Sequence, residues 1–98
     1  MSKVTVVRYQ TTVEAADENQ RLVEQVYSEL AANDPGGLRY ATFRLDDGVT
    51  FVHVSFVDGE ENPLLTTAAF QAFQAGLSGR VVLGPEPRSA VVVGSYRL

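Results

Sequence analysis

Two segments rich in β-branched and aromatic residues, at 38–45 and 49–57, are separated only by Asp46-Asp47-Gly48. An Asp-Gly pair tolerates the positive φ angles of a tight type I′ turn, so the two segments are expected to pair as an antiparallel hairpin. The turn also sets the register of the pair, and the register decides which side chains share a face. The chain therefore predicts a sheet built around this hairpin.

A strand and a helix are predicted before the hairpin. Residues 4–11 are β-branched and aromatic, which is typical of a strand. Thr11 and Glu14 have the spacing of a capping box, which marks the start of a helix. Apolar residues then recur at helical spacing until the helix-breaking run 33–37, so this helix is expected to end near Ala32.

A second helix and a last strand are predicted after the hairpin. Asn62-Pro63 is a good cap followed by a first-turn proline, and the helix that it starts should end at Gly79, with a possible break near Thr66-Thr67. We expect a loop around residues 85–87, because two prolines stand there. The apolar segment 89–97 would then form the final strand.

The resulting βαββαβ order is that of the ferredoxin-like α+β fold, in which a four-stranded antiparallel sheet carries both helices on one face. A chain of 98 residues with 45% hydrophobic content provides material for one core. We therefore expect residues 1–98 to form one domain. The other face of its sheet would have no helix to cover it.

The first and last predicted strands are apolar on both sides, with Val6 beside Val7 and an unbroken run Val91-Val92-Val93. Strands that are buried on both faces have such runs. The chain has no cysteine with which to brace a small core by disulfides. Because twofold homodimers are the commonest oligomers, a second identical sheet is the expected cover. This arrangement would be a dimeric α+β barrel.

The predicted register divides the hairpin into two sides, with Thr42 opposite His53 and Tyr40 opposite Ser55. The polar and aromatic side carries Tyr40, Thr42, Arg44, Phe51, His53 and Ser55. The other side is apolar and consists of Ala41, Phe43, Val52 and Val54. We expect the apolar side to pack against the helices and the polar side to face the space between the two sheets of the dimer.

A ligand cavity is predicted in that space between the sheets. Arg8 is hard to bury beneath helices, so Val4, Val6 and Arg8 are placed on the cavity side of the first strand. A small aromatic or carboxylate-bearing ligand would suit these groups. The predicted ligand-binding residues are Arg8, Tyr40, Thr42, Phe51 and Ser55.

His53 is the only histidine and the candidate catalytic residue. It would accept a proton from a phenolic or enolic substrate, with Tyr40 and Arg8 orienting the anion. Other interpretations stay open: His53 could be a core histidine satisfied by Thr42 or Tyr40, Tyr40 and Phe51 could pack the dimer, and Arg8 could form an ion pair between subunits.

Composition argues against several classes of partner. The net charge is −4 and the basic residues are scattered, so nucleic acid is not expected as a partner. The first residues show no apolar leader segment, and no run has membrane-spanning length, so we expect a cytoplasmic protein that does not bind membranes. With no cysteine and one histidine, neither a metal site nor a cofactor is expected.

Three segments resemble a known superfamily. They are Arg-Leu-Asp-Asp-Gly-Val-Thr-Phe-Val-His-Val at 44–54, Ala-Phe-Gln-Ala-Phe-Gln at 69–74 and Gly-Ser-Tyr at 94–96. The chain is similar to the dimeric α+β barrel superfamily, near its antibiotic biosynthesis monooxygenase-like domains. The resemblance implies a dimer whose sheets enclose ligand cavities.

The resemblance also implies a choice of functions, because members include cofactor-independent oxygenases, haem-degrading enzymes, isomerases and proteins with no known activity. The oxygenases and haem-degrading enzymes commonly use a tryptophan and an asparagine, whereas this chain has no tryptophan and its asparagines, Asn19, Asn33 and Asn62, fall outside the predicted strands. The sequence therefore predicts a homodimer that binds a small aromatic metabolite and could act as a cofactor-independent monooxygenase-like enzyme. The alternatives are a structural dimer with a filled interface and a ligand-sensing module.

Overall fold

The computed structural model describes residues 2–98, and Met1 lies outside them. Its elements follow the βαββαβ order, with two short 3₁₀ turns beside the second helix. The elements are β1 (Lys3–Thr11), α1 (Ala16–Asn33), β2 (Leu38–Arg44), β3 (Thr50–Val57), η1 (Pro63–Thr66), α2 (Ala68–Ala75), η2 (Leu77–Gly79) and β4 (Val81–Ala90). The ferredoxin-like fold predicted from the sequence is confirmed.

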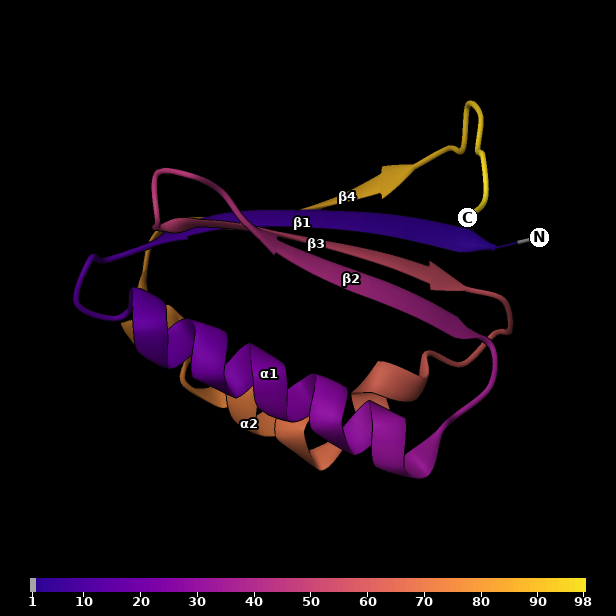
Figure 1. Cartoon of the computed structure of the whole chain (residues 1–98), viewed down its shortest axis with the longest axis horizontal. Helices are drawn as coiled ribbons and strands as arrows, with labels where there is room; N and C mark the ends of the chain where they lie inside the picture. Colours follow the sequence, from indigo (N-terminus) through magenta and orange to yellow (C-terminus); the bar gives the residue numbers. More distant parts are fainter. Residues whose placement is uncertain (1) are drawn as a thin grey trace.

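The four strands form one antiparallel sheet in the order β2-β3-β1-β4. Both helices lie on one face of this sheet, and the other face carries no helix (Figure 1). The predicted hairpin register is confirmed, since Tyr40 pairs with Ser55, Thr42 with His53 and Arg44 with Phe51. The predicted type I′ turn was wrong, because Gly48 has a φ of 79° whereas Asp47 does not have a positive φ. The Gly48 amide instead donates to the Leu45 carbonyl at 3.0 Å, and the Leu45 amide donates to the Thr50 carbonyl at 2.8 Å.

The helices begin and end close to the predicted positions. Helix α1 ends at Asn33, but its start is not a capping box, because the amide of Ala15 donates instead to the Thr12 hydroxyl. Asn62 caps the second helical segment by accepting from the amide of Leu64. The expected break near Thr66-Thr67 is present, since η1 ends there and α2 follows.

The last strand is not where the sequence analysis placed it. Strand β4 spans Val81–Ala90, so the predicted strand 89–97 was wrong, and so was the loop expected around 85–87. Pro85 and Pro87 belong to an edge strand, the position in a sheet where a residue without an N–H is tolerated. The apolar residues that follow Ala90 extend beyond the sheet at the C-terminal end of the chain (Figure 1).

The assignment of the two sides of the hairpin was also wrong. The polar and aromatic side of the hairpin faces the helices: Phe51 and His53 are buried, and Thr42 contacts Tyr27 of α1. The apolar side is the one without helices, where Phe43 is 54% exposed. The core between the sheet and the helices is formed around Tyr9, Val23, Val26, Phe51, Leu64 and Phe73.

Candidate functional site

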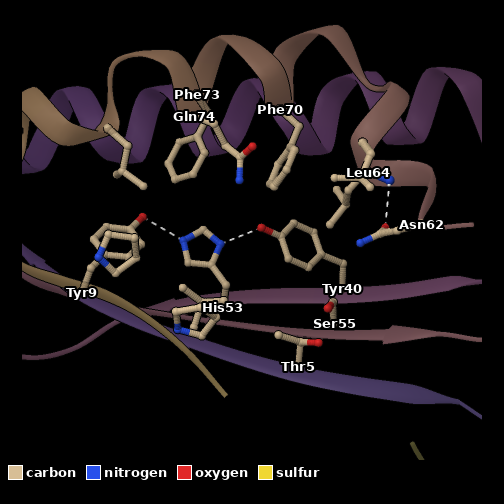
Figure 2. Close-up of a pocket in the computed structure, with 15 residues that line it drawn as sticks. Thr5, Tyr9, Tyr40, His53, Ser55, Asn62, Leu64, Phe70, Phe73 and Gln74 are labelled. Atoms are coloured by element: carbon tan, nitrogen blue, oxygen red, sulfur yellow. Dashed lines mark hydrogen bonds between the residues drawn. The ribbon is translucent and has the colours of Figure 1, made fainter. Parts of the chain in front are cut away.

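A cavity of about 260 Å³ lies between the sheet and the segment that contains η1 and α2. Figure 2 shows side chains of the strands on its floor and the rings of Phe70 and Phe73 reaching down from the helical side. This cavity is therefore formed within a single chain, between its sheet and its helical side. It is lined by Thr5, Val7, Tyr9, Tyr40, His53, Ser55, Asn62, Leu64, Leu65, Phe70, Phe73, Gln74, Leu77, Pro85 and Pro87.

The register of the sheet explains which strand residues reach the cavity. Thr5 is opposite Ser55 and Val7 is opposite His53, and directly opposed residues of antiparallel strands share a face. On the helical side, the bend between η1 and α2 holds Leu64 and Phe73 at the cavity wall. Glu29 of α1 fixes the start of α2, because its carboxylate accepts from the amides of Ala68 and Ala69 at 3.0 and 2.9 Å.

His53 lies at the centre of the floor with a phenol at each ring nitrogen (Figure 2). The hydroxyl oxygen of Tyr9 is 2.7 Å from Nε2, and that of Tyr40 is 2.6 Å from Nδ1. The hydroxyl of Thr42 is a second partner of Nδ1 at 3.1 Å and also contacts the hydroxyl of Tyr27 at 2.7 Å. A ligand could reach either nitrogen only by displacing a phenol.

Burial shifts the pKa of each titratable group in this cluster toward its neutral form. It lowers the pKa of His53 from 6.5 to about 4, because the imidazolium would lose its hydration. It raises the pKa of Tyr9 to about 12, although the Asn19 hydrogen bond and the charge of Arg80 act in the opposite direction. The pKa of Tyr40 is also raised by burial. The site is therefore uncharged at neutral pH.

Two residues that the sequence analysis did not select extend the cluster into the core. Asn19 of α1 is 0% exposed, and its amide nitrogen donates to the Tyr9 hydroxyl at 2.8 Å. Arg80, which follows η2, donates from Nε to the Asn19 oxygen at 3.0 Å and from its terminal nitrogen to the Phe73 carbonyl at 2.8 Å. The spacing of Asn19 from Val23 and Val26 on one helix face was the signal that could have revealed it.

The structure brings only part of the predicted site together. Tyr40, His53 and Ser55 line the cavity. Thr42 joins them through the Nδ1 contact, whereas Phe51 stacks on Tyr9 in the core, with ring centroids 5.6 Å apart. Arg8 is exposed on the opposite face of the sheet, so its placement beside His53 was wrong. The prediction that Arg8 lies on the face away from the helices is correct, and the error was to put His53 on that face as well.

The cavity offers only neutral groups to a ligand. Its polar contributions are hydroxyls, two amide side chains and the neutral imidazole, and the remaining lining residues are apolar or aromatic. Within residues 2–98, no cluster of three histidine, cysteine, aspartate or glutamate side chains could hold a metal ion. No helix in the same part of the chain is both long and apolar enough to cross a membrane.

Comparison with known proteins relates the chain to others by structure alone. No protein-family model matches it, and no curated protein is significantly similar in sequence. A Chloroflexus aurantiacus protein provisionally named an antibiotic biosynthesis monooxygenase is similar to it, with 14% identity, a TM-score of 0.73, and coverage of 98% of this chain and 97% of that one. At these identities the likeness establishes the fold.

Two further solved structures have the same fold. SnoaB, a cofactor-independent oxygenase from Streptomyces nogalater, is 14% identical with a TM-score of 0.72, and the match covers 99% of this chain and 98% of SnoaB. A dimeric ferredoxin-like protein from an uncultured marine organism is 16% identical with a TM-score of 0.64, over 97% of this chain and 90% of the other. The chain therefore has the ferredoxin-like fold found among antibiotic biosynthesis monooxygenase-like proteins.

Proposed function

We propose that this protein is a homodimer in which each chain binds a small, uncharged aromatic molecule in the cavity between the sheet and α2. The observation that carries the proposal is a cavity of about 260 Å³ whose walls are aromatic and aliphatic and whose polar groups are all neutral. Ligand sites are typically apolar cavities with a few convergent polar groups. Tyr40 and Ser55 supply hydroxyls, and Asn62 and Gln74 supply amides.

The cavity volume limits the size of the ligand. Pockets for drug-sized molecules are typically about 300–1,000 Å³, so this one suits a compound of one or two rings. Phe70 and Phe73 provide faces and edges against which such a ring can pack.

The charge of the lining limits the class of the ligand. Among the residues predicted to bind it, only Arg8 could have paired with a carboxylate, and Arg8 lies on the other face of the sheet. Moving an unpaired carboxylate from water into an apolar cavity costs far more free energy than hydrogen bonds from neutral hydroxyl and amide groups recover. We therefore restrict the proposal to uncharged aromatic molecules.

The exposed face of the sheet supports the dimer. Phe43, which is 54% exposed, lies on that face with the half-buried residues Val6 of β1 and Val52, Val54 and Phe56 of β3. Exposed apolar surfaces of this kind commonly mark protein interfaces. One solved structure with this fold is described as dimeric. Because a twofold dimer buries the same patch on both copies, one such surface is sufficient.

Binding is tested with acetophenone and benzoate, which have the same ring and differ in charge. Titration followed by NMR should show binding of acetophenone and at least tenfold weaker binding of benzoate. Thr5→Phe, which fills the cavity floor, should abolish binding, whereas Thr66→Phe at an exposed position outside the cavity should not. Equal affinity for both compounds, or binding that survives Thr5→Phe, would contradict the proposal.

A second candidate is an enzyme that acts on the same class of molecule. His53 is neutral at pH 7, a state in which a ring nitrogen can take a proton from a phenol, and the fold is shared with a cofactor-independent oxygenase. The phenolate of a substrate such as 1-naphthol would then react with dioxygen to give a naphthoquinone and water. Oxygen uptake above the buffer rate that is lost in His53→Ala would support this candidate, and uptake at the buffer rate would remove it.

A further inference from the structure

A chain of hydrogen bonds leads from Arg80 through Asn19 and Tyr9 to His53. The donor and the acceptor of each bond in this chain can be assigned, because the guanidinium of Arg80 can only donate. A guanidinium has five N–H donors and no acceptor. Arg80 Nε points at one end of the Asn19 amide over 3.0 Å, so that end must be the oxygen. The amide nitrogen of Asn19 is therefore the atom that faces Tyr9 Oη at 2.8 Å. Arg80 thus fixes which way the Asn19 amide is turned.

The direction passes from Asn19 to the ring of His53 through Tyr9. The Tyr9 oxygen accepts from Asn19, and its own hydrogen needs an acceptor because the hydroxyl is buried. His53 Nε2 lies 2.7 Å away and is the other partner of that hydroxyl in the structure. Nε2 must then carry a lone pair and no proton.

The single proton of the neutral imidazole is left on Nδ1. No carboxylate contacts the ring among the described residues, whose contacts to it come from Tyr9 of β1, Tyr40 and Thr42 of β2, and Phe73 of α2. Nδ1–H donates to Tyr40 Oη at 2.6 Å. The Tyr40 oxygen is then an acceptor toward His53, so its own hydrogen can turn only to Thr42 or into the cavity.

We propose that Arg80 is a positioning residue that acts through Asn19 and Tyr9 to hold His53 as the Nδ1–H tautomer. The Tyr40 hydroxyl then donates to a ligand oxygen, so the cavity selects aromatic carbonyl compounds. The selection of carbonyl compounds rests on the proposed ligand site, whereas the tautomer does not. Arg80 itself is 8% exposed and forms no ion pair within residues 2–98. Its charge is instead directed at the amide oxygen of Asn19.

The same chain of hydrogen bonds gives His53 a chemical role other than that of a base. The lone pair of Nε2 is occupied by the Tyr9 hydroxyl, and Nδ1 presents a proton. In this state His53 donates to the Tyr40 oxygen, which leaves the Tyr40 hydrogen free to be donated, and His53 cannot take a proton from a substrate. This hydrogen-bond arrangement therefore favours the binding function over the enzymatic candidate.

The tautomer is tested directly, because His53 is the only histidine and gives an unambiguous signal. Long-range proton–nitrogen NMR on the ¹⁵N-labelled protein at pH 7 should show a protonated Nδ1 and an unprotonated Nε2. A protonated Nε2 in the unmodified protein would overturn the proposal.

Asn19→Asp tests whether Arg80 and Asn19 set that tautomer. The introduced carboxylate has no donor, so it would accept from both Arg80 and Tyr9, and Tyr9 could then only accept from His53. The ring proton should move to Nε2, while the exposed control Asn33→Asp should leave it on Nδ1. An unchanged tautomer in Asn19→Asp would overturn the role of Arg80. If Asn19→Asp does not fold, Tyr9→Phe replaces it, and mixed tautomers are expected there.

Ligand selection is tested with acetophenone and α-methylstyrene, which differ by a carbonyl oxygen in place of a methylene carbon. Tyr40→Phe and Asn19→Asp should each weaken acetophenone binding about three- to tenfold, the effect of one neutral hydrogen bond, and leave α-methylstyrene binding unchanged. Equal losses for both compounds would overturn the selection. If neither compound binds the unmodified protein, the proposed ligand site is wrong, and the NMR result still tests the tautomer of His53 and the role of Arg80.

Discussion

The hydroxyl oxygen of Tyr40 lies 2.6 Å from Nδ1 of His53, beneath the helices of the domain. The two residues come from neighbouring strands, and Tyr9 completes the pattern at the other ring nitrogen. Each polar atom in this group has a partner, and no buried side-chain nitrogen or oxygen of the described residues lacks one. A polar face can therefore be buried here, since its hydrogen bonds replace those made to water.

Removing the imidazole should leave the Tyr9 and Tyr40 hydroxyls without their His53 partner, although Tyr9 keeps the hydrogen bond from Asn19. His53→Ala is expected to lower the free energy of unfolding by about 3 kcal/mol, because each buried unsatisfied group costs about 1–3 kcal/mol. Tyr40→Phe, which removes one hydroxyl and leaves His53 with Thr42, should cost about 1 kcal/mol. Urea unfolding at pH 7 measures both values. Equal stabilities of His53→Ala and the unmodified protein would show that the cluster does not stabilise the fold.

Stability should fall as the pH drops from about 6.5 to about 4. The folded-state pKa of His53 is about 4, below its ordinary 6.5, so the unfolded chain binds the proton first as the pH falls. The stabilisation is complete above about pH 6.5 and is lost progressively down to about pH 4, with a loss of about 2 kcal/mol by pH 5. Urea unfolding across this range measures it, and His53→Gln should lack this dependence. An equal slope in His53→Gln would assign the effect to other groups.

Glu29 should stabilise the short helix that forms one wall of the cavity. Its carboxylate accepts from the first two amides of α2, which otherwise have no partner within the helix. Glu29→Ala is expected to cost about 1–2 kcal/mol of unfolding free energy. Glu24→Ala removes an exposed carboxylate from α1, the helix that also carries Glu29, and should cost less than about 0.5 kcal/mol. Thermal unfolding of both variants compares them, and equal losses would contradict the capping role.

Gly76 leaves room for the guanidinium of Arg80. A Cβ at position 76 would lie 2.7 Å from a terminal nitrogen of Arg80, which two hydrogen bonds hold in place. Gly76→Ala is therefore expected to be less stable than Gly79→Ala by about 1–2 kcal/mol, since a Cβ at 79 would meet nothing within 4 Å. Urea unfolding compares the two variants, and equal stability would mean that Arg80 moves aside without loss.

The proposed dimer should depend on the exposed face of the sheet. Phe43→Asp places a charge on the part of that face formed by the edge strand β2 and should convert a dimer into a monomer at micromolar concentration. Val13→Asp changes a residue that is 77% exposed in the turn before α1 and should leave the mass unchanged. Native mass spectrometry or light scattering measures the mass. A monomeric unmodified protein would remove the proposed dimer but not the cavity.

The hairpin could be predicted because local chemistry determines it. Asp46, Asp47 and Gly48 do form the turn and the predicted register is correct, although the turn is held by the Asp47 carboxylate accepting from the amides of Val49 and Thr50 and is not of type I′. Which side of the hairpin is buried depends instead on partners that are distant in the chain. Asn19 and Tyr27 of α1 supply hydrogen bonds that make the polar side the buried one. The helical spacing of Asn19 with Val23 and Val26 places Asn19 on the buried face of α1, but it does not show which strand residues Asn19 meets, so the apolar side was assigned to the helices.

The last strand shows a second limit of local patterns. The run Val91-Val92-Val93 has strong β propensity, yet Val93 is 99% exposed and outside the sheet. The segment 81–90 contains two prolines and a glycine, which argue against a strand in the middle of a sheet but not against one at its edge. The position of a strand within the sheet therefore outweighed its composition.

The two prolines of β4 also limit how copies of this chain can assemble. A free sheet edge normally offers a ladder of N–H and C=O groups on which a strand of another molecule can grow, as in fibrils. Pro85 and Pro87 interrupt that ladder twice within three residues, because neither has an N–H to give. End-to-end extension of the sheet past β4 by a strand of another molecule is thereby disfavoured.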